Sequence, residues 1–139
     1  MSKHNDPKLI PELICSDFST SLYFYTETLG FSVKYDRPEE GFAMLEFQGA
    51  MLMIDEIRVE EGKRSWITAP LEKPYGRGIN LQIEVSDINH LYERLKAKDI
   101  PLFMDIEDKE YNCDGAVLVS RQFIVQDPDG YLLRFFEEL

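Results

Sequence analysis

The sequence predicts an α+β fold in which two βαβββ modules form a curved mixed sheet with a cleft. A strand-like run followed by an amphipathic helix pattern occurs twice, and three further β-type runs follow each helix. Both first strands end in Ser-Asp before a large apolar residue, with the serines at positions 16 and 86, which lie 70 residues apart. A repeat of this length in two copies is typical of a duplicated module rather than of a solenoid.

Two helices are predicted from the spacing of apolar residues. The buried face of the first is expected to hold Phe18, Leu22, Tyr25 and Leu29. Asp17 or Ser19 is expected to cap its start, and Gly30 suits the left-handed position past its end. The second is expected to bury Ile88, Leu91 and Leu95, and its Lys and Arg residues cluster in the last turns, where the helix dipole favours cations.

The order of the elements predicts one domain over residues 1–139. Module one is expected at about 8–57, a linker at about 58–78 and module two at about 79–139. The linker is rich in Gly and Pro, which favours a long loop, and long ordered loops in compact domains are often functional.

Composition restricts the partners of the chain. The formal net charge of −11 opposes the phosphates of nucleic acids and anionic lipids. No segment approaches the about 20 apolar residues that span a bilayer, and the first residues contain no apolar stretch for a signal peptide. Cys15 and Cys113 have no framework of spacings and are expected to be free thiols. We therefore expect a cytoplasmic protein that binds neither nucleic acid nor membrane.

Alternation along the strands separates two faces of the sheet. In the run 79–85, one face is predicted to be apolar and the other polar: Ile79, Leu81, Ile83 and Val85 against Asn80, Gln82 and Glu84. In the run 42–47, Ala43, Leu45 and Phe47 oppose Phe42, Met44 and Glu46. One face is expected to pack on the helices. The mixed face favours a ligand cleft or an interface, with a solvated sheet face as the alternative.

Three segments resemble the vicinal oxygen chelate superfamily, which includes glyoxalase I and the bleomycin resistance proteins. They are "SLYFYTETLGF", the strand end "IEVSD" and "FIVQDPDGYLLRF". The resemblance implies the paired βαβββ fold and, in the metal-dependent members, four metal ligands on the strands. It places these four positions at Ile10, Met53, Asn80 and Arg134.

These four residues are poor ligands for a divalent metal, because none of them offers an imidazole, thiolate or carboxylate. The Arg134 guanidinium is in addition a charged donor without a lone pair to offer. His4 and His90 are expected at the surface. We therefore predict no metal and no cofactor. The alternative is an unusual oxygen site without histidine, made by Glu12, Gln82 and Glu84.

The resemblance thus favours the metal-free branch, whose bleomycin resistance proteins are acidic homodimers that sequester a bulky, cationic, aromatic drug. Phe42 matches the stacking aromatic of that branch, whereas Val119 stands near the place of its expected tryptophan. Trp66 is expected either to cover the cleft or to anchor the linker. Arg134 is expected either to grip a ligand or to neutralise neighbouring carboxylates.

We predict a metal-free small-molecule-binding protein, a homodimer that sequesters a bulky aromatic or cationic ligand, for example a cationic aromatic antibiotic, in a cleft at the dimer interface. The predicted ligand-binding residues are Phe42, Met44, Glu46, Met53, Trp66, Asn80, Gln82 and Arg134. One alternative is a metal-dependent glyoxalase-type lyase or isomerase, or a dioxygenase. Another is a metal-free enzyme with Glu12 or Glu84 as general base.

Overall fold

The computed structural model describes residues 6–57 and 66–139, and confirms the predicted order of elements in both modules. The chain divides into two compact units, one reaching to Tyr75 and including Pro128–Gly130, and the other holding Gly76–Asp127 and Tyr131–Leu139. That both modules form a single domain, with a cleft, stays a prediction, and part of the predicted linker lies outside the described residues.

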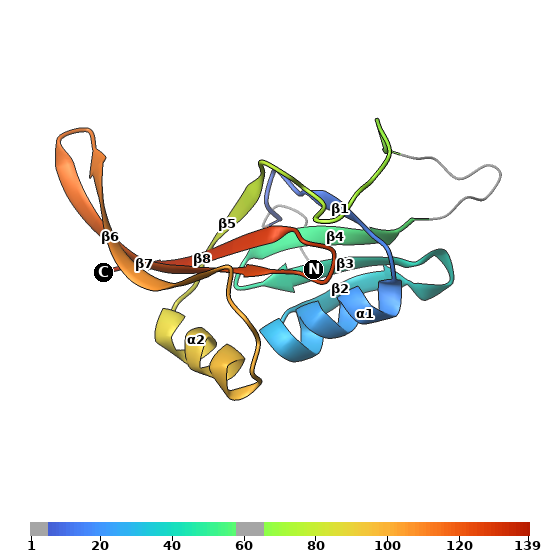
Figure 1. Cartoon of the computed structure of the whole chain (residues 1–139), viewed down its shortest axis with the longest axis horizontal. Coiled ribbons are helices and arrows are strands. Elements are labelled where there is room, and N and C mark those ends of the chain that lie inside the picture. The colour runs from blue at the N-terminus through green and yellow to red at the C-terminus, as the bar shows by residue number, and fades with distance from the viewer. Residues whose placement is uncertain (1–5, 58–65) are drawn as a thin grey trace. The chain divides into compact units, whose positions relative to one another are not determined.

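Module one forms a four-stranded mixed sheet in the order β1-β4-β3-β2 (Figure 1). Its elements are β1 (Glu12–Cys15), α1 (Phe18–Tyr23), a π-helical turn (Phe24–Leu29), β2 (Ser32–Arg37), a short 3-10 turn (Pro38–Glu40), β3 (Phe42–Phe47) and β4 (Ala50–Glu56). Strand β1 is parallel to β4, and the other neighbours are antiparallel.

Module two repeats this topology in the order β5-β8-β7-β6. Its elements are β5 (Asn80–Glu84), α2 (Ile88–Ala97), β6 (Met104–Cys113), β7 (Ala116–Gln126) and β8 (Leu132–Glu138). Strand β5 is parallel to β8, whereas β6, β7 and β8 are antiparallel neighbours. Strands β6 and β7 form a hairpin whose tip projects beyond the end of β8 (Figure 1).

The duplication extends to the capping of the helices. Asp17 accepts hydrogen bonds from the backbone N–H groups of Ser19 and Thr20, and Asp87 accepts one from His90. A second carboxylate, from the last strand of each module, accepts the N–H of the first helical residue: Glu56 from Phe18 at 2.8 Å, and Glu137 from Ile88 at 3.0 Å. Each helix is therefore fixed to its own sheet at its N-terminus.

Two details of the predicted core were wrong. In the first helix Phe18, Tyr25 and Leu29 are buried as predicted, whereas Leu22 is only half-buried and Ser21 and Thr28 complete the buried face. Ile79 is 60% exposed, because it precedes β5 rather than belonging to it. The predicted burial of Ile88, Leu91 and Leu95 is confirmed, as are the cap at Asp17 and the left-handed Gly30.

Both cysteines and one of the two histidines lie in the described part of the chain. His90 is exposed, whereas His4 lies outside the described residues. Cys15 is buried and Cys113 exposed, and both are free thiols, although Cys113 ends β6 rather than lying in a loop. Over residues 6–57 and 66–139, no helix has the length and apolarity that a membrane span requires.

Candidate functional site

Arg134 can occupy an otherwise apolar strand because the two faces of β8 lie in different environments. Leu133 and Phe135 point into the core of module two and are fully buried. Leu132, Arg134 and Phe136 alternate with them and belong to the opposite face, where they are half-buried. The guanidinium therefore lies on the face of the sheet that α2 does not cover.

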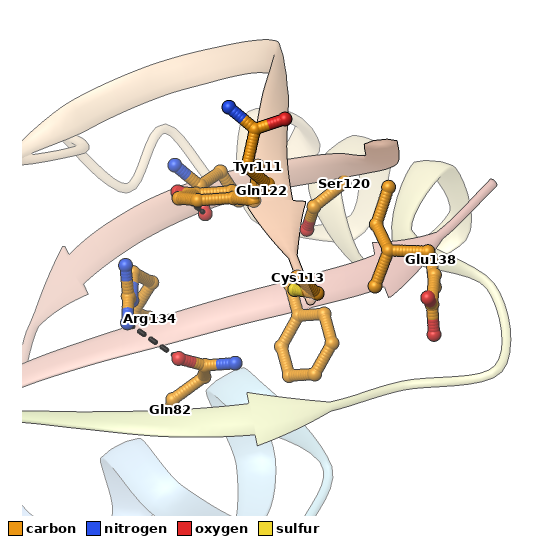
Figure 2. A pocket seen from close by; sticks show the side chains of 10 residues that line it. Gln82, Tyr111, Cys113, Ser120, Gln122, Arg134 and Glu138 are labelled. Carbon is orange, nitrogen blue, oxygen red and sulfur yellow. Dashed lines mark hydrogen bonds between the residues drawn. The ribbon is translucent and has the colours of Figure 1, made fainter. Parts of the chain in front are cut away.

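This face of module two contains a pocket of about 290 Å³ (Figure 2). Gln82 comes from β5 and Arg134 from β8, and the two are direct partners in the strand register. Ser120 and Gln122 project from β7, and Tyr111 comes from β6. The remaining lining is formed by Asn112, Cys113, Leu118, Phe136 and Glu138.

Two hydrogen bonds order the polar side of the pocket. Arg134 Nη2 donates to Gln82 Oε1, and Tyr111 Oη donates to Gln122 Oε1 at 3.1 Å. Arg134 Nε is buried, and no described residue supplies an acceptor for it. A buried N–H without a partner is unfavourable by about 1–3 kcal/mol. The hydrogen bonding of the Arg134 guanidinium is therefore incomplete within the described residues.

The pocket combines these polar groups with apolar surface. Leu118 and Phe136 line it beside the Tyr111 ring, and Gln122 and Ser120 are almost fully buried at 6% and 8% exposure. Apolar walls with a few fixed polar groups are the usual composition of small-molecule sites. The pocket is therefore suited to hold a flat organic group and to orient it.

Module one contains a second cluster of predicted site residues. Phe42, Met44 and Met51 form a buried apolar cluster, with Met53 and Ile10 packed against it. Phe42, Met44 and Met53 come from adjacent strands on the face opposite to Ala43 and Leu45. The alternation predicted for β3 is thus confirmed, but both of its faces are buried.

The N-terminal segment contributes to this burial. Pro11 O accepts a hydrogen bond from Met53 N on β4, whereas the Asp6 carboxylate lies 2.7 Å from Lys34 Nζ on β2. These strands are separated by β3, so residues 6–11 must cross the sheet. Ile10 packs on the Phe42 cluster, which identifies the face that is crossed. The methionine-rich face of module one is therefore covered by the chain's own N-terminal segment.

The polar and aromatic candidates of module one also have partners within the chain. The Arg37 guanidinium lies 4.2 Å from the ring centre of Phe42, in a cation–π contact. Glu46 accepts a hydrogen bond from Gly49 N at 2.8 Å and so holds the β3–β4 turn. Trp66 is 52% exposed in the described part of the linker, and Asn80 is exposed at the start of β5.

The structure thus brings together Gln82 and Arg134 in module two, and Phe42, Met44 and Met53 in module one. Tyr111, Ser120, Gln122 and Phe136 were not predicted. Strand alternation carries a signal for the residues on β7, since Ser120 and Gln122 are the polar positions of one face. The turn Asp114-Gly115, with both residues at positive φ, sets the register that places Tyr111 opposite Leu118.

The donor set does not fit a divalent metal. The four positions that the resemblance implies are Ile10, Met53, Asn80 and Arg134, and none offers an imidazole, thiolate or carboxylate. Within the described residues, no group of three or more His, Cys, Asp and Glu side chains is placed to hold a metal ion. The alternative oxygen site that includes Gln82 is disfavoured as well, because the Arg134 guanidinium is hydrogen-bonded to Gln82 Oε1 and would repel a metal ion there.

Comparison with known proteins agrees with this fold. The model of the Glyoxalase/Bleomycin resistance protein/Dioxygenase superfamily matches residues 10–135. The chain belongs to this superfamily. Among its relatives, the bleomycin resistance proteins of Geobacillus stearothermophilus and Staphylococcus aureus are 30% identical over 141 aligned positions, covering 94% of this chain and 96% of theirs.

Solved structures of the superfamily share the architecture. A glyoxalase/bleomycin resistance protein/dioxygenase from Nocardioides matches with a TM-score of 0.67 and 28% identity, covering 96% of this chain and 84% of that one. TioX from Micromonospora sp. ML1 also has a TM-score of 0.67, at 21% identity, covering 96% and 99% of the two chains. These likenesses confirm the predicted α+β fold of two modules.

Proposed function

We propose that this chain is a metal-free small-molecule-binding protein of the bleomycin-resistance-like branch, which sequesters its ligand without transforming it. The observation that carries the proposal is the module-two pocket, which is lined by Arg134, the residue at a position where the resemblance implies a metal ligand in the metal-dependent members. A guanidinium with a buried Nε–H that lacks an acceptor is suited to bind an organic group rather than a cation.

Further support comes from the relatives named bleomycin resistance protein, whose similarity extends over nearly the whole chain. The formal charge of −11 would raise the local concentration of cationic ligands, a property suited to sequestration. The proposal includes a homodimer with the ligand at the interface. Light scattering coupled to gel filtration tests this part, with a single-chain mass as the contradicting result.

Calorimetric titration of the full chain with metal-free bleomycin tests the proposed function. We expect saturable binding that a chelator does not change, followed by recovery of intact ligand in mass spectrometry. A panel of aromatic antibiotics and metabolites in a thermal-shift screen extends the test, since a ligand stabilises by RT ln(1 + [L]/Kd). Multiple turnover of a panel compound, or binding that requires a divalent metal, would support the enzyme alternatives instead.

A further inference from the structure

The Arg134 end of the module-two pocket offers its ligand mainly hydrogen-bond donors. Gln82 Oε1 already accepts from Arg134, and Gln122 Oε1 already accepts from Tyr111. Within the described residues neither amide NH₂ group forms a hydrogen bond, so both are available to a ligand as donors, whereas one of the two lone pairs of each carbonyl oxygen is already used. The internal hydrogen bonds therefore set the polarity of the pocket.

Arg134 adds a charged donor of the same kind. Its Nη2 is engaged by Gln82, whereas its buried Nε–H has no acceptor among the described residues. A ligand oxygen beside the guanidinium would form a charge-assisted hydrogen bond. Nothing similar favours a cation here, since a guanidinium repels one.

The space beside these donors suits a flat ring. Leu118, Phe136 and the Tyr111 ring supply apolar contact surface, and the volume of about 290 Å³ lies near the lower end of ligand pockets. A small aromatic group, either free or as part of a larger molecule, fits both the size and the lining.

We propose that this pocket selects an aromatic ring that carries a carboxylate or carbonyl group, with its oxygen accepting from the Arg134 guanidinium and from the amide groups of Gln82 and Gln122. The inference rests on the proposed function, because it specifies the ligand class of the same pocket.

Glu138 sets the expected orientation of the bound ligand. It lines the pocket four residues along β8 from Arg134, which corresponds to about 13 Å of extended strand. Figure 2 shows Gln82 and Arg134 at one end of the labelled group and Glu138 at the other. A larger ligand with a cationic arm is therefore oriented with its acceptor at Arg134 and its positive charge toward Glu138.

Three probes with the same ring test the charge preference. Naphthoate, naphthamide and naphthylmethylammonium, all substituted at the same ring carbon, are titrated calorimetrically into the full chain at neutral pH. We expect naphthoate to bind most tightly and the ammonium compound on the order of tenfold to a hundredfold more weakly, the range of one charge-assisted hydrogen bond. Equal affinities, a preference for the ammonium compound, or no binding of naphthoate would overturn the inference.

Matched variants assign the preference to the pocket. Arg134→Gln is expected to weaken naphthoate binding by about tenfold or more and to remove the gap between the probes. Arg121→Gln is the control, because Arg121 lies on β7 but faces the opposite side of the sheet, where it pairs with Asp108 at 2.7 Å. A gap that persists in Arg134→Gln, or that disappears equally in Arg121→Gln, would contradict the assignment.

A second variant keeps the test decisive if Arg134→Gln does not fold. Gln122→Glu preserves the shape of the side chain and the oxygen that accepts from Tyr111, but replaces the donor by a carboxylate. It is expected to lower the naphthoate affinity at least about tenfold and to favour the ammonium compound. Unchanged naphthoate affinity would contradict the proposed donor role of this amide.

The two proposals fail in different ways. If panel compounds bind without turnover but the three naphthalene probes do not differ, the proposed function stands and the inference on ligand class is wrong. If turnover or a metal requirement is found while naphthoate still binds through Arg134, the function is wrong and the ligand class stands.

Discussion

At the scale of single residues, the turn between β7 and β8 depends on a glycine that no other residue can replace. Gly130 has φ of +108°, and a Cβ atom there would lie 2.6 Å from Pro74 Cα and 3.0 Å from Tyr75 N. Both neighbours are backbone, so they can move only if the chain is displaced. Conformation and space therefore both require glycine here.

Gly130→Ala is expected to reduce the free energy of unfolding by at least about 3 kcal/mol, from left-handed strain and steric overlap together. Gly49→Ala separates the two effects, because Gly49 has φ of +92° but no heavy atom within 4 Å of an added Cβ. Strain alone predicts about 1–2 kcal/mol for that variant. Urea denaturation measures both, and equal losses would show that the contact with Pro74 is unimportant.

Individual site residues were predictable where strand alternation alone decides the outcome. Gln82 and Arg134 share a face because each alternates with core residues along its strand, Ile83 next to Gln82 and Phe135 next to Arg134. Alternation gives the face of a side chain but not the segments that cover it. The burial of Phe42 and Met44 beneath residues 6–11 depends on long-range contacts, which strand patterns do not contain.

At the scale of elements, the N-terminal segment acts as a cover for the methionine-rich face of module one. Ile10 packs against the apolar cluster, whereas the adjacent Leu9 is 80% exposed. Ile10→Ala is therefore expected to destabilise the chain by about 1–2 kcal/mol, and Leu9→Ala by at most about 0.5 kcal/mol. Denaturation midpoints compare the two variants. Equal effects would contradict a specific packing role for this segment.

The β6–β7 hairpin carries an ion pair whose effect on stability should depend on pH. Arg121 Nε donates to Asp108 Oδ1 at 2.7 Å and Nη2 to Oδ2 at 3.0 Å. These hydrogen bonds to Arg121 lower the pKa of the Asp108 carboxyl in the folded chain. Because the folded pKa is lower than the unfolded one, the stabilisation is present above the unfolded pKa and is lost as the pH falls through the folded pKa.

Asp108→Asn removes this pair, so its stability deficit relative to the unmodified chain should be present near neutrality and should shrink below about pH 4. Urea midpoints recorded over the acid range measure the deficit. High salt should reduce it as well, since the pair is exposed and screened. A deficit that is constant across the pH range would show that the pair does not contribute through its charge.

The elements themselves were well predicted because local signals agree. Both helices begin at the expected Ser-Asp caps, and the strands coincide with the β-type runs. The sequence did not predict the length of β6 from Met104 to Cys113, because its polar residues lack an apolar alternation and the strand is specified by pairing with β7. The π-helical turn was missed for a similar reason, since it has no strong sequence signature.

At the scale of the whole molecule, the chain passes from the second unit into the first and back again within the short turn between β7 and β8. Pro128–Gly130 belongs to the first unit, whereas the strands on either side of it belong to the second. The turn is tied closely: Asp127 N donates to Tyr131 O at 2.9 Å, and Tyr131 N donates to Asp127 Oδ1 at 3.0 Å. Asp129 is 1% exposed and accepts hydrogen bonds from Ser16 N at 3.0 Å and from Ser16 Oγ at 2.5 Å.

The effect of Asp129→Ala on stability should therefore extend beyond the first unit. Loss of a buried carboxylate that accepts two hydrogen bonds and lies 3.3 Å from Lys73 Nζ is expected to reduce the free energy of unfolding by about 2–4 kcal/mol. Because the connection 127–131 fixes the ends of β7 and β8, hydrogen exchange should accelerate in these strands as well as in β1. Asp36→Ala, at an exposed position of β2, is the control and should change neither. Faster exchange confined to the first unit would show that the two units open independently, despite the turn they share.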